Sequence, residues 1–367
     1  MEPFANLNTA WFALIGVLWA GYLFLEGFDF GVAVVTPFLV RDELDRRLCL
    51  NAVGPTWDGN EVWLLVAGGA TFAAFPLWYA RLFSGFYLAL FLILLALIAR
   101  GVSFEFRDKD PRPAWRSTWD WANFLGSLVP AIVWGVAFTD LVHGLPLGPD
   151  GRYTGGLLGL LHPIALLGGV TSLVVFASHG ATFLSLKTTG ELSERAERAA
   201  RLLAPVAMAA AAGTFAWVAA AGRPAVPGAL PGAVPLVFAL VALLALAAHV
   251  LLLGRGRQGF AFLATGLAIL ATMAAVFARM FPAVLASSSV ESHTLTIGEA
   301  SAGHLTLVVM TVVAGIFTPL VLAYQGWTYW VFRARLVRPP VGPADVLRES
   351  GGATPTSPAA GPFERPR

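Results

Sequence analysis

Residues 57–75, WDGNEVWLLVAGGATFAAF, place two carboxylates and two tryptophans directly before an apolar run. As a helix, the run from Val62 to Phe75 covers about 21 Å at 1.5 Å per residue. The hydrocarbon core of a bilayer is roughly 30 Å thick. A helix that crosses a membrane here must therefore include the acidic WDGNE segment. Asp58 and Glu61 are expected near a membrane boundary and, being three residues apart, on one helix face.

The composition of the whole chain indicates a membrane protein. The 367 residues are 57% hydrophobic and 13% charged, whereas soluble domains carry about 25% charged residues. Lipid cannot satisfy backbone hydrogen bonds, so the spans are expected to be helices. The single cysteine, Cys49, excludes an internal disulfide and argues against a metal–thiolate cluster. The N-terminal MEPFANLNTA has no basic stretch, so the first apolar run is expected to be a retained span.

The sequence predicts an all-α protein with nine transmembrane helices. The expected spans are residues 10–36, 58–77, 80–100, 119–141, 158–185, 202–221, 233–254, 259–281 and 304–332. Glycines expected to let these helices pack closely are Gly16, Gly21, Gly68, Gly69, Gly168 and Gly169. We expect a transmembrane helical domain over residues 1–338. Residues 339–367, rich in Pro, Gly and Ser, are expected to form a disordered cytoplasmic tail.

The distribution of positive charge predicts the orientation. With the N-terminus outside, twenty of the 24 Lys and Arg residues fall in the cytoplasmic loops and the C-terminal segment. The external side then keeps only Arg81, Arg152, Arg223 and Arg279. This asymmetry follows the positive-inside rule and fits an odd number of spans.

Five charged residues are expected in or near the cytoplasmic half of the membrane, where each charge costs at least about 2.5–3.5 kcal/mol. They are Glu26, Asp29, Asp58, Glu61 and Arg100. Glu26 and Asp29 can form a structural ion pair or hydrogen bond, or act in a proton relay or polar cavity. Asp58 and Glu61 fit either a helix capping box or a functional role. Arg100, expected to end the third span, fits a snorkelling boundary residue or a counter-ion.

The histidines give a weaker signal. His162, His179 and His249 fall within or near spans, whereas His143, His293 and His304 fall near the external side. A histidine in a membrane can ligate haem, but none of these has a partner on an adjacent helical turn. The pattern favours hydrogen-bonded structural histidines.

Several motifs resemble subunit II of the cytochrome bd-type quinol oxidases, and together they cover nearly the whole chain except the tail. They are GFDFG (27–31), GPTWDGNEVWLLVAGGATFAAFPLWYA (54–80), FSGFY (83–87), WDWANFLGSLVP (119–130) and GATFLSLKTTGEL (180–192), with weaker matches at MFPAVLASSS (280–289) and LTLVVMTVVAGIFTPLVLAYQGWTYW (305–330). The stretch at 54–80 is the longest and the most specific.

The resemblance implies a nine-helix subunit of the bacterial cytoplasmic membrane. Its partner would be subunit I, which binds haem b and haem d, oxidises quinol on the outer side and reduces dioxygen to water with cytoplasmic protons. Subunit II would bind no haem itself. Other implied partners are membrane lipid and a small accessory subunit.

The same resemblance assigns roles to individual residues. It implies a proton path at Glu26, Asp29, Asp58 and Arg100; at Glu61, relatives can have glutamine, which makes it the least secure proton carrier. Trp63 matches a residue near a proposed oxygen route. Trp57 and Trp63 are both candidate contacts for quinone or for the oxygen path. A structural quinone is a further implied ligand. The alternatives are a proton-coupled secondary transporter, which tends to show paired repeats, and a purely structural subunit.

Overall fold

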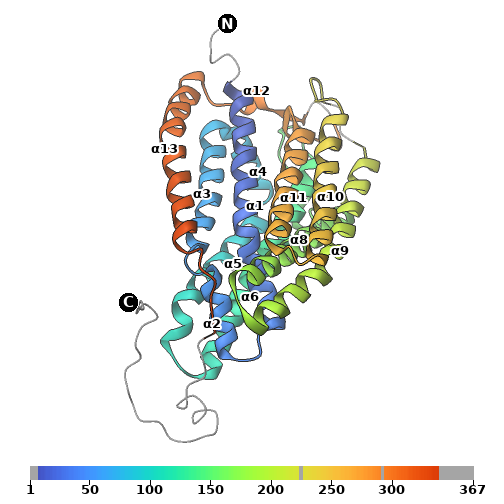
Figure 1. Cartoon of the computed structure of the whole chain (residues 1–367). Coiled ribbons are helices and arrows are strands. Elements are labelled where there is room, and N and C mark those ends of the chain that lie inside the picture. The colour runs from blue at the N-terminus through green and yellow to red at the C-terminus, as the bar shows by residue number, and fades with distance from the viewer. Residues whose placement is uncertain (1–6, 223–225, 291–292, 339–367) are drawn as a thin grey trace, which may run out of the picture.

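The computed structural model describes residues 7–222, 226–290 and 293–338, and these form a bundle of long helices (Figure 1). The helices are α1 (Leu7–Leu39), α2 (Glu43–Val53), α3 (Trp57–Ala74), α4 (Pro76–Gly85), α5 (Tyr87–Phe106), η1 (Arg107–Lys109), α6 (Pro113–His143), α7 (Gly156–Gly159), α8 (Pro163–Lys187), α9 (Gly190–Ala220), α10 (Ala233–Gly254), α11 (Gln258–Met280), α12 (Ile297–Ala300) and α13 (His304–Val331). Two short strands, β1 (Ala283–Leu285) and β2 (Leu295–Thr296), pair antiparallel.

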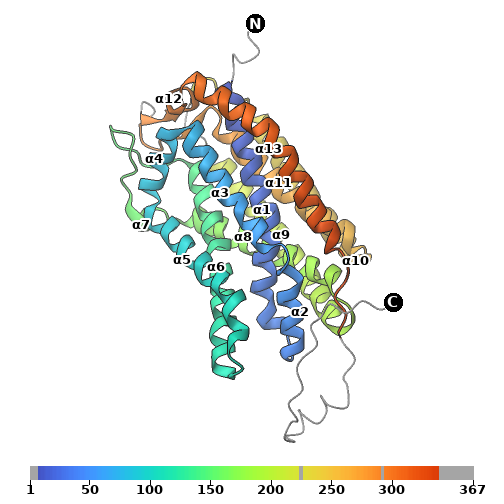
Figure 2. The same ribbon diagram turned by 90° about the vertical axis from the view of Figure 1, so that its left-hand side faces the viewer.

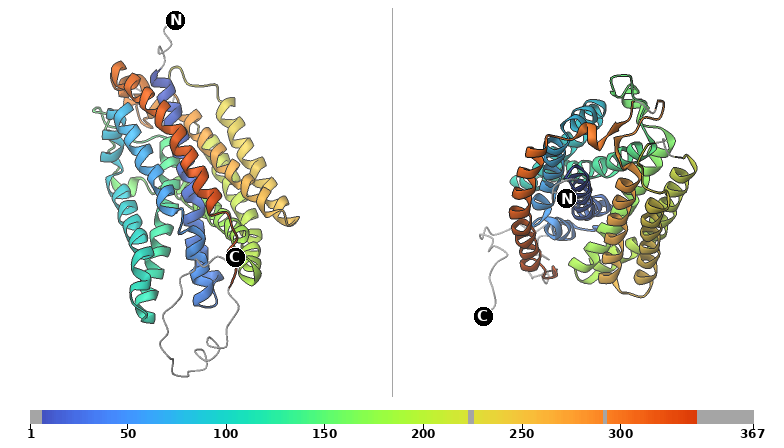
Figure 3. Two further views of the ribbon diagram at one scale, coloured as in Figure 1. Left: turned by 60° about the vertical axis from the view of Figure 1, so that its left-hand side comes forward. Right: turned by 90° about the horizontal axis from the view of Figure 1, so that it is seen from above.

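Helix α1 forms the centre of the bundle and packs against α3, α6, α8 and α11. Seen from above, the other long helices surround it (Figure 3). Helix α13 slants across one side of the molecule beside α3 (Figure 2). It is barely covered, since Leu307 is its only fully buried residue.

Glycines allow the closest helix crossing. A Cβ atom on Gly31 of α1 would lie 1.8 Å from the Phe176 carbonyl oxygen of α8, and one on Gly180 would lie 2.3 Å from the Gly31 carbonyl carbon. Neither position accepts a side chain, so the backbones of α1 and α8 meet directly here.

Four of the six glycines predicted to lie at helix contacts are confirmed there. A Cβ on any of these four would come within about 3 Å of a neighbouring side chain: Gly16, Gly21, Gly168 and Gly169. Gly68 and Gly69 differ, because a Cβ on either would meet no atom of another described element within 4 Å. These two glycines of α3 therefore leave a smooth outward surface.

The predicted helical membrane architecture is confirmed, with differences in individual spans. Eight helices of the described ranges are long and apolar enough to cross a membrane: α1, α5, α6, α8, α9, α10, α11 and α13. Helix α3 is not among them, because its 18 residues begin with the polar WDGNE segment. The count of nine spans, like the orientation, stays a prediction.

The third predicted span, 80–100, was wrong in its limits. The chain breaks at Phe86, so that residues 76–85 form α4, and α5 starts only at Tyr87 and continues to Phe106. Arg100 therefore lies inside α5 and does not end it. Helix α9 also starts 12 residues before the predicted span, because the charged segment from Gly190 continues the helix outside the apolar run.

Ion pairs show that many basic segments meet at one end of the bundle. Arg195 at the start of α9 and Arg338, which follows α13, both pair with Asp45 of α2. Arg107 after α5 pairs with Glu43 of α2 and with Asp120 of α6. The positive-inside rule predicts that this end faces the cytoplasm. The predicted tail, residues 339–367, lies outside the described residues.

Candidate functional site

The centre of the candidate site is the guanidinium of Arg100 on α5. Its side chain is fully buried, and Nη1 donates to Oε1 of Glu26 on α1 and to Oε2 of Glu61 on α3, the latter at 3.0 Å. The rings of Phe30 and Trp57 lie 5.1 and 5.7 Å from the guanidinium carbon. Arg100 thus has the geometry of a counter-ion and does not snorkel to the boundary.

Asp29 lies one helical turn after Glu26 and is also fully buried. Its Oδ2 accepts a hydrogen bond of 2.7 Å from Nδ2 of Asn60 on α3. The structure therefore brings Glu26, Asp29, Glu61 and Arg100 together. All four were expected from the sequence at a similar depth in the membrane.

Asp58 occupies a different position, on the exposed surface of α3. Helix α3 begins at Trp57 after Thr56, which makes no side-chain capping hydrogen bond. The capping-box interpretation is therefore wrong: Glu61 reaches Arg100 and does not turn back to cap the helix. The ring of Trp57 stacks on Phe104 of α5, with 4.8 Å between ring centroids.

Several polar atoms in the cluster have no hydrogen-bond partner among the described residues. They are Oε2 of Glu26, Oδ1 of Asp29, and Nε and Nη2 of Arg100. Buried polar atoms of this kind are nearly always hydrogen-bonded in proteins. The cluster thus keeps hydrogen-bonding capacity that no side chain in the described chain uses.

A network from α13, missed by the sequence analysis, completes the site. Oδ1 of Asn60 accepts from the Tyr329 hydroxyl at 2.8 Å and from Nε2 of Gln325 at 3.0 Å. Oε1 of Gln325 in turn accepts from Nε1 of Trp63 at 2.8 Å. The one available signal was the occurrence of polar Gln325 and Tyr329 in an otherwise apolar final span.

Three histidines predicted within or near spans contact other residues of the bundle. The Nδ1 of His179 bonds Thr265 Oγ1 and its ring stacks on Phe262 at 4.4 Å, while its buried Nε2 has no hydrogen-bond partner among the described residues. Both nitrogens of His249 are engaged, with Ser178 Oγ and the Ala261 carbonyl. Nε2 of His162 lies 2.7 Å from the buried carboxylate of Asp140.

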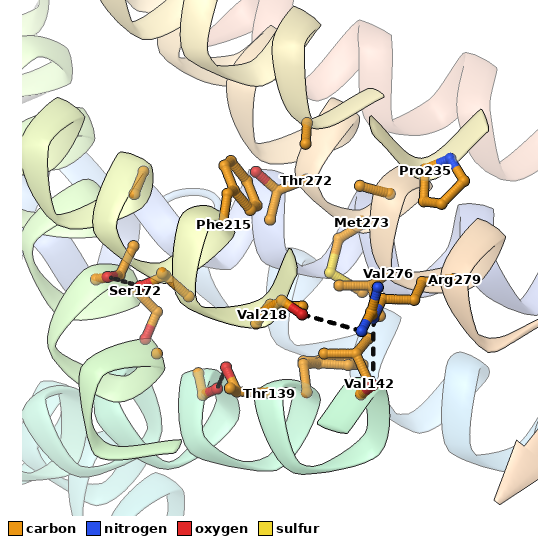
Figure 4. A pocket seen from close by; sticks show the side chains of 18 of the residues that line it. Thr139, Val142, Ser172, Phe215, Val218, Pro235, Thr272, Met273, Val276 and Arg279 are labelled. Atoms are coloured by element: carbon orange, nitrogen blue, oxygen red, sulfur yellow. Dashed lines mark hydrogen bonds between the residues drawn. The ribbon is translucent and has the colours of Figure 1, made fainter. Parts of the chain in front are cut away.

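An apolar cavity of about 350 Å³ lies between α6, α8, α9, α10 and α11 (Figure 4). Its apolar walls include Phe215, Met273 and Val276, and Thr139 and Ser172 add hydroxyls. At its edge, Nη2 of Arg279 donates to the Val218 carbonyl at 3.0 Å. Neither Trp57 nor Trp63 lines this cavity.

Together these features define a class: a polytopic helical membrane protein with a buried charge cluster near its more basic end. Residues 7–332 match the family described as cytochrome bd terminal oxidase subunit II. The chain belongs to this family.

Individual relatives agree with that assignment. The chain is 40% identical over 332 residues to cytochrome bd ubiquinol oxidase subunit 2 of Bacillus subtilis, with 90% of this chain and 97% of the relative covered. It is 37% identical over 368 residues to cytochrome bd-I ubiquinol oxidase subunit 2 of Escherichia coli K12, with 92% and 97% covered. A chain in the structure of bd oxidase from Geobacillus thermodenitrificans shares the fold, with a TM-score of 0.57, 12% identity, and 90% and 99% covered.

The family establishes the broad function. The protein is a subunit of a bd-type terminal oxidase, a quinol:oxygen oxidoreductase complex of the bacterial inner membrane that contains haem and a partner subunit I. This assignment excludes the transporter alternative. The roles of the individual site residues are not established by it.

Proposed function

We propose that this subunit stabilises the haem-bearing subunit I and supplies it with cytoplasmic protons through the Arg100 cluster. The observation that carries the proposal is the contact of one buried guanidinium with two carboxylates that differ in exposure. The side chain of Glu61 is 24% exposed, whereas that of Glu26 is fully buried. The cluster therefore spans the boundary between accessible and inaccessible carboxylates.

The proposed route follows this gradient of exposure. Asp58, exposed near the start of α3, would take protons from the cytoplasm, and Glu61 would pass them to the buried pair Glu26 and Asp29. Arg100 is the positively charged partner of Glu26 and Glu61 along this route. Oxidation of quinol outside and consumption of protons from inside would then charge the membrane without a pump.

We propose that subunit I docks on the face formed by α3 and α13. Large apolar residues are exposed there, including Leu65 on α3 and Leu320 on α13. A Cβ on Gly68 or Gly69 of α3, or on Gly315 of α13, would meet no atom of another described element within 4 Å. Small residues allow close helix packing in membranes. Haem b and haem d belong to subunit I in this proposal, and membrane lipid and a small accessory subunit would cover other apolar surfaces.

The cavity between α6 and α11 is the proposed place for a structural quinone. Its apolar walls suit an isoprenoid chain, while the hydroxyls of Thr139 and Ser172 already donate to the backbone carbonyls of Gly135 and Ala131. Trp57 and Trp63 lie outside the cavity, so any contact they make with oxygen or quinone belongs to another site.

The test uses the intact complex purified from its native membrane. The optical spectrum should show haem in a protein that purifies together with this chain. Asp58→Asn should leave the haem content unchanged but lower quinol oxidase turnover by about tenfold or more, the scale of a lost proton-transfer group. Glu194→Gln, which removes an exposed carboxylate on α9, is the matched control and should retain turnover.

Two results would count against the proposal. Full turnover of the Asp58→Asn complex would remove Asp58 from the proton path. Parallel loss of haem and turnover would favour the alternative in which these carboxylates only hold the complex together.

A further inference from the structure

The side-chain amide of Asn60 has one orientation imposed from α13. Its oxygen accepts from Tyr329 and Gln325, and its nitrogen donates to Asp29. An amide oxygen only accepts and an amide nitrogen only donates. The two donors on α13 therefore turn the Asn60 oxygen toward themselves and its NH₂ group toward the carboxylate.

This orientation makes the two oxygens of Asp29 unequal. Oδ2 already accepts a hydrogen bond from Asn60, whereas Oδ1 is buried and has no partner among the described residues. A proton bound to Oδ2 would compete with the Asn60 hydrogen, so a proton on this carboxyl belongs on Oδ1. The amide also keeps the carboxyl group from rotating to exchange the two atoms.

We propose that Asn60, oriented by Gln325 and Tyr329, is a positioning residue that makes Oδ1 of Asp29 the proton-exchanging atom. This inference rests on the proposed proton path and adds α13 to it. Helix α13 thereby has a role that its low burial conceals, because the hydrogen bonds of Gln325 and Tyr329 reach Asp29 through Asn60.

Other charged or titratable groups also act on Asp29 and must be separated from this effect. They come from each helix around it: Glu26 on α1, Glu61 on α3, Arg100 on α5 and Tyr329 on α13. Removal of the Tyr329 hydroxyl by Tyr329→Phe leaves the other three groups in place.

The structure offers a control at the other end of α13. There Nε1 of Trp11 donates to Thr311 Oγ1 at 3.0 Å and also bonds the Leu307 carbonyl. Thr311→Val removes a side-chain bond between α13 and α1 but does not touch Asn60. The turnover of the Thr311→Val complex therefore shows the effect of loosening α13 alone.

The experiment compares Tyr329→Phe, Asn60→Leu, the double variant and Thr311→Val in the purified complex. Tyr329→Phe should lower turnover by about two- to tenfold, as expected for loss of one of two hydrogen bonds, and Asn60→Leu by more. The double variant should match Asn60→Leu, because Tyr329 acts through Asn60. Thr311→Val should retain turnover, and all four should retain haem.

Infrared difference spectra over pH provide a readout that a structural role would not move. The carboxylic C=O band that Asp29→Asn abolishes belongs to Asp29. It should shift to higher frequency in Asn60→Leu, which removes the hydrogen bond to Oδ2, and stay in place in Thr311→Val. An unshifted band, no Asp29 band at any pH, or an independent loss from Tyr329→Phe in the Asn60→Leu background would overturn the inference.

The two proposals can fail separately. If Asp29→Asn retains full turnover, Asp29 is not in the proton path, and the infrared shift still decides whether Asn60 positions its carboxyl. If Asn60→Leu fails to assemble, the band shift and turnover of Tyr329→Phe decide the positioning role.

Discussion

The guanidinium of Arg100 lies 3.0 Å from the carboxylate of Glu61, and this contact joins a fully buried cation to a side chain that solvent partly reaches. A buried charge is tolerated when partners compensate it, and losing one partner leaves the others uncompensated. The buried side of this cluster should thus control assembly, whereas its outer side should control turnover.

Arg100→Gln should prevent assembly of the complex. It would leave Glu26 buried without its cation, and breaking a buried pair in this way costs about 3–5 kcal/mol. The yield of haem-containing complex from membranes measures the effect. Arg100→Lys, which keeps the charge but replaces the planar guanidinium with an ammonium, should retain more complex than Arg100→Gln, and equal yields would contradict a role for the charge.

The substitution Glu61→Gln should damage the complex less than Glu26→Gln does. The Glu61 side chain is 24% exposed and an amide oxygen can still accept from Arg100, whereas Glu26 is fully buried. We expect the Glu61→Gln complex to keep its haem but lose turnover by about tenfold or more, and the Glu26→Gln complex to lose haem as well. Haem content and quinol-driven oxygen consumption of the two purified complexes check this difference.

Asp45→Asn should destabilise the end of the bundle where the ion pairs of α2 gather. Asp45 is 1% exposed, pairs with Arg195 and Arg338, and accepts from the Arg41 backbone. Removing the negative charge of Asp45 should lower the free energy of unfolding by about 3–5 kcal/mol. This loss would be visible as a lower unfolding temperature of the purified complex. Glu197→Gln, which breaks the more exposed pair with Arg201, should change stability by less than about 1 kcal/mol.

Acidification should weaken the contact of Glu43 on α2 with Arg107. Burial works to raise the pKa of Glu43, but two hydrogen bonds of 2.9 Å from Arg107 outweigh it and hold this pKa below its usual value. The resulting stability is present above the unfolded pKa of about 4.3 and is lost as pH falls through the lower folded pKa. Unfolding temperatures from pH 6 to 3 should decline less in Glu43→Gln than in the unmodified protein. Equal declines would show that Glu43 adds nothing.

Much of the fold could be predicted from apolar runs and glycines, because membrane helices must satisfy their backbone internally. The limits of α4 and α5 could not be predicted in this way. Residues 76–106 are apolar on both sides of Phe86, so the run conceals the break, and helix α5 continues past Arg100 into a charged segment. The start of α9 was hidden for the opposite reason, since its first turns are polar.

The charged part of the candidate site could be predicted, because charged residues within apolar spans are energetically costly and easily recognised in the sequence. Glu26, Asp29, Glu61 and Arg100 were selected for this reason and lie together. Asn60 was missed because a neutral amide carries no comparable cost, and its partners come from α13, more than 260 residues later in the chain. Long-range pairs of neutral side chains have no periodic signal in a single sequence.

The position of α13 at the end of the described chain has a consequence for biogenesis. Synthesis proceeds from the N-terminus, so α1, α3 and α5 enter the bilayer while the donors that orient Asn60 are still untranslated. Until α13 arrives, the nascent subunit has its buried acids but lacks the side chains that hold them in register. Among the described helices α13 is the last to be made, so the hydrogen bonds to Asn60 form only after α1, α3 and α5 are in place.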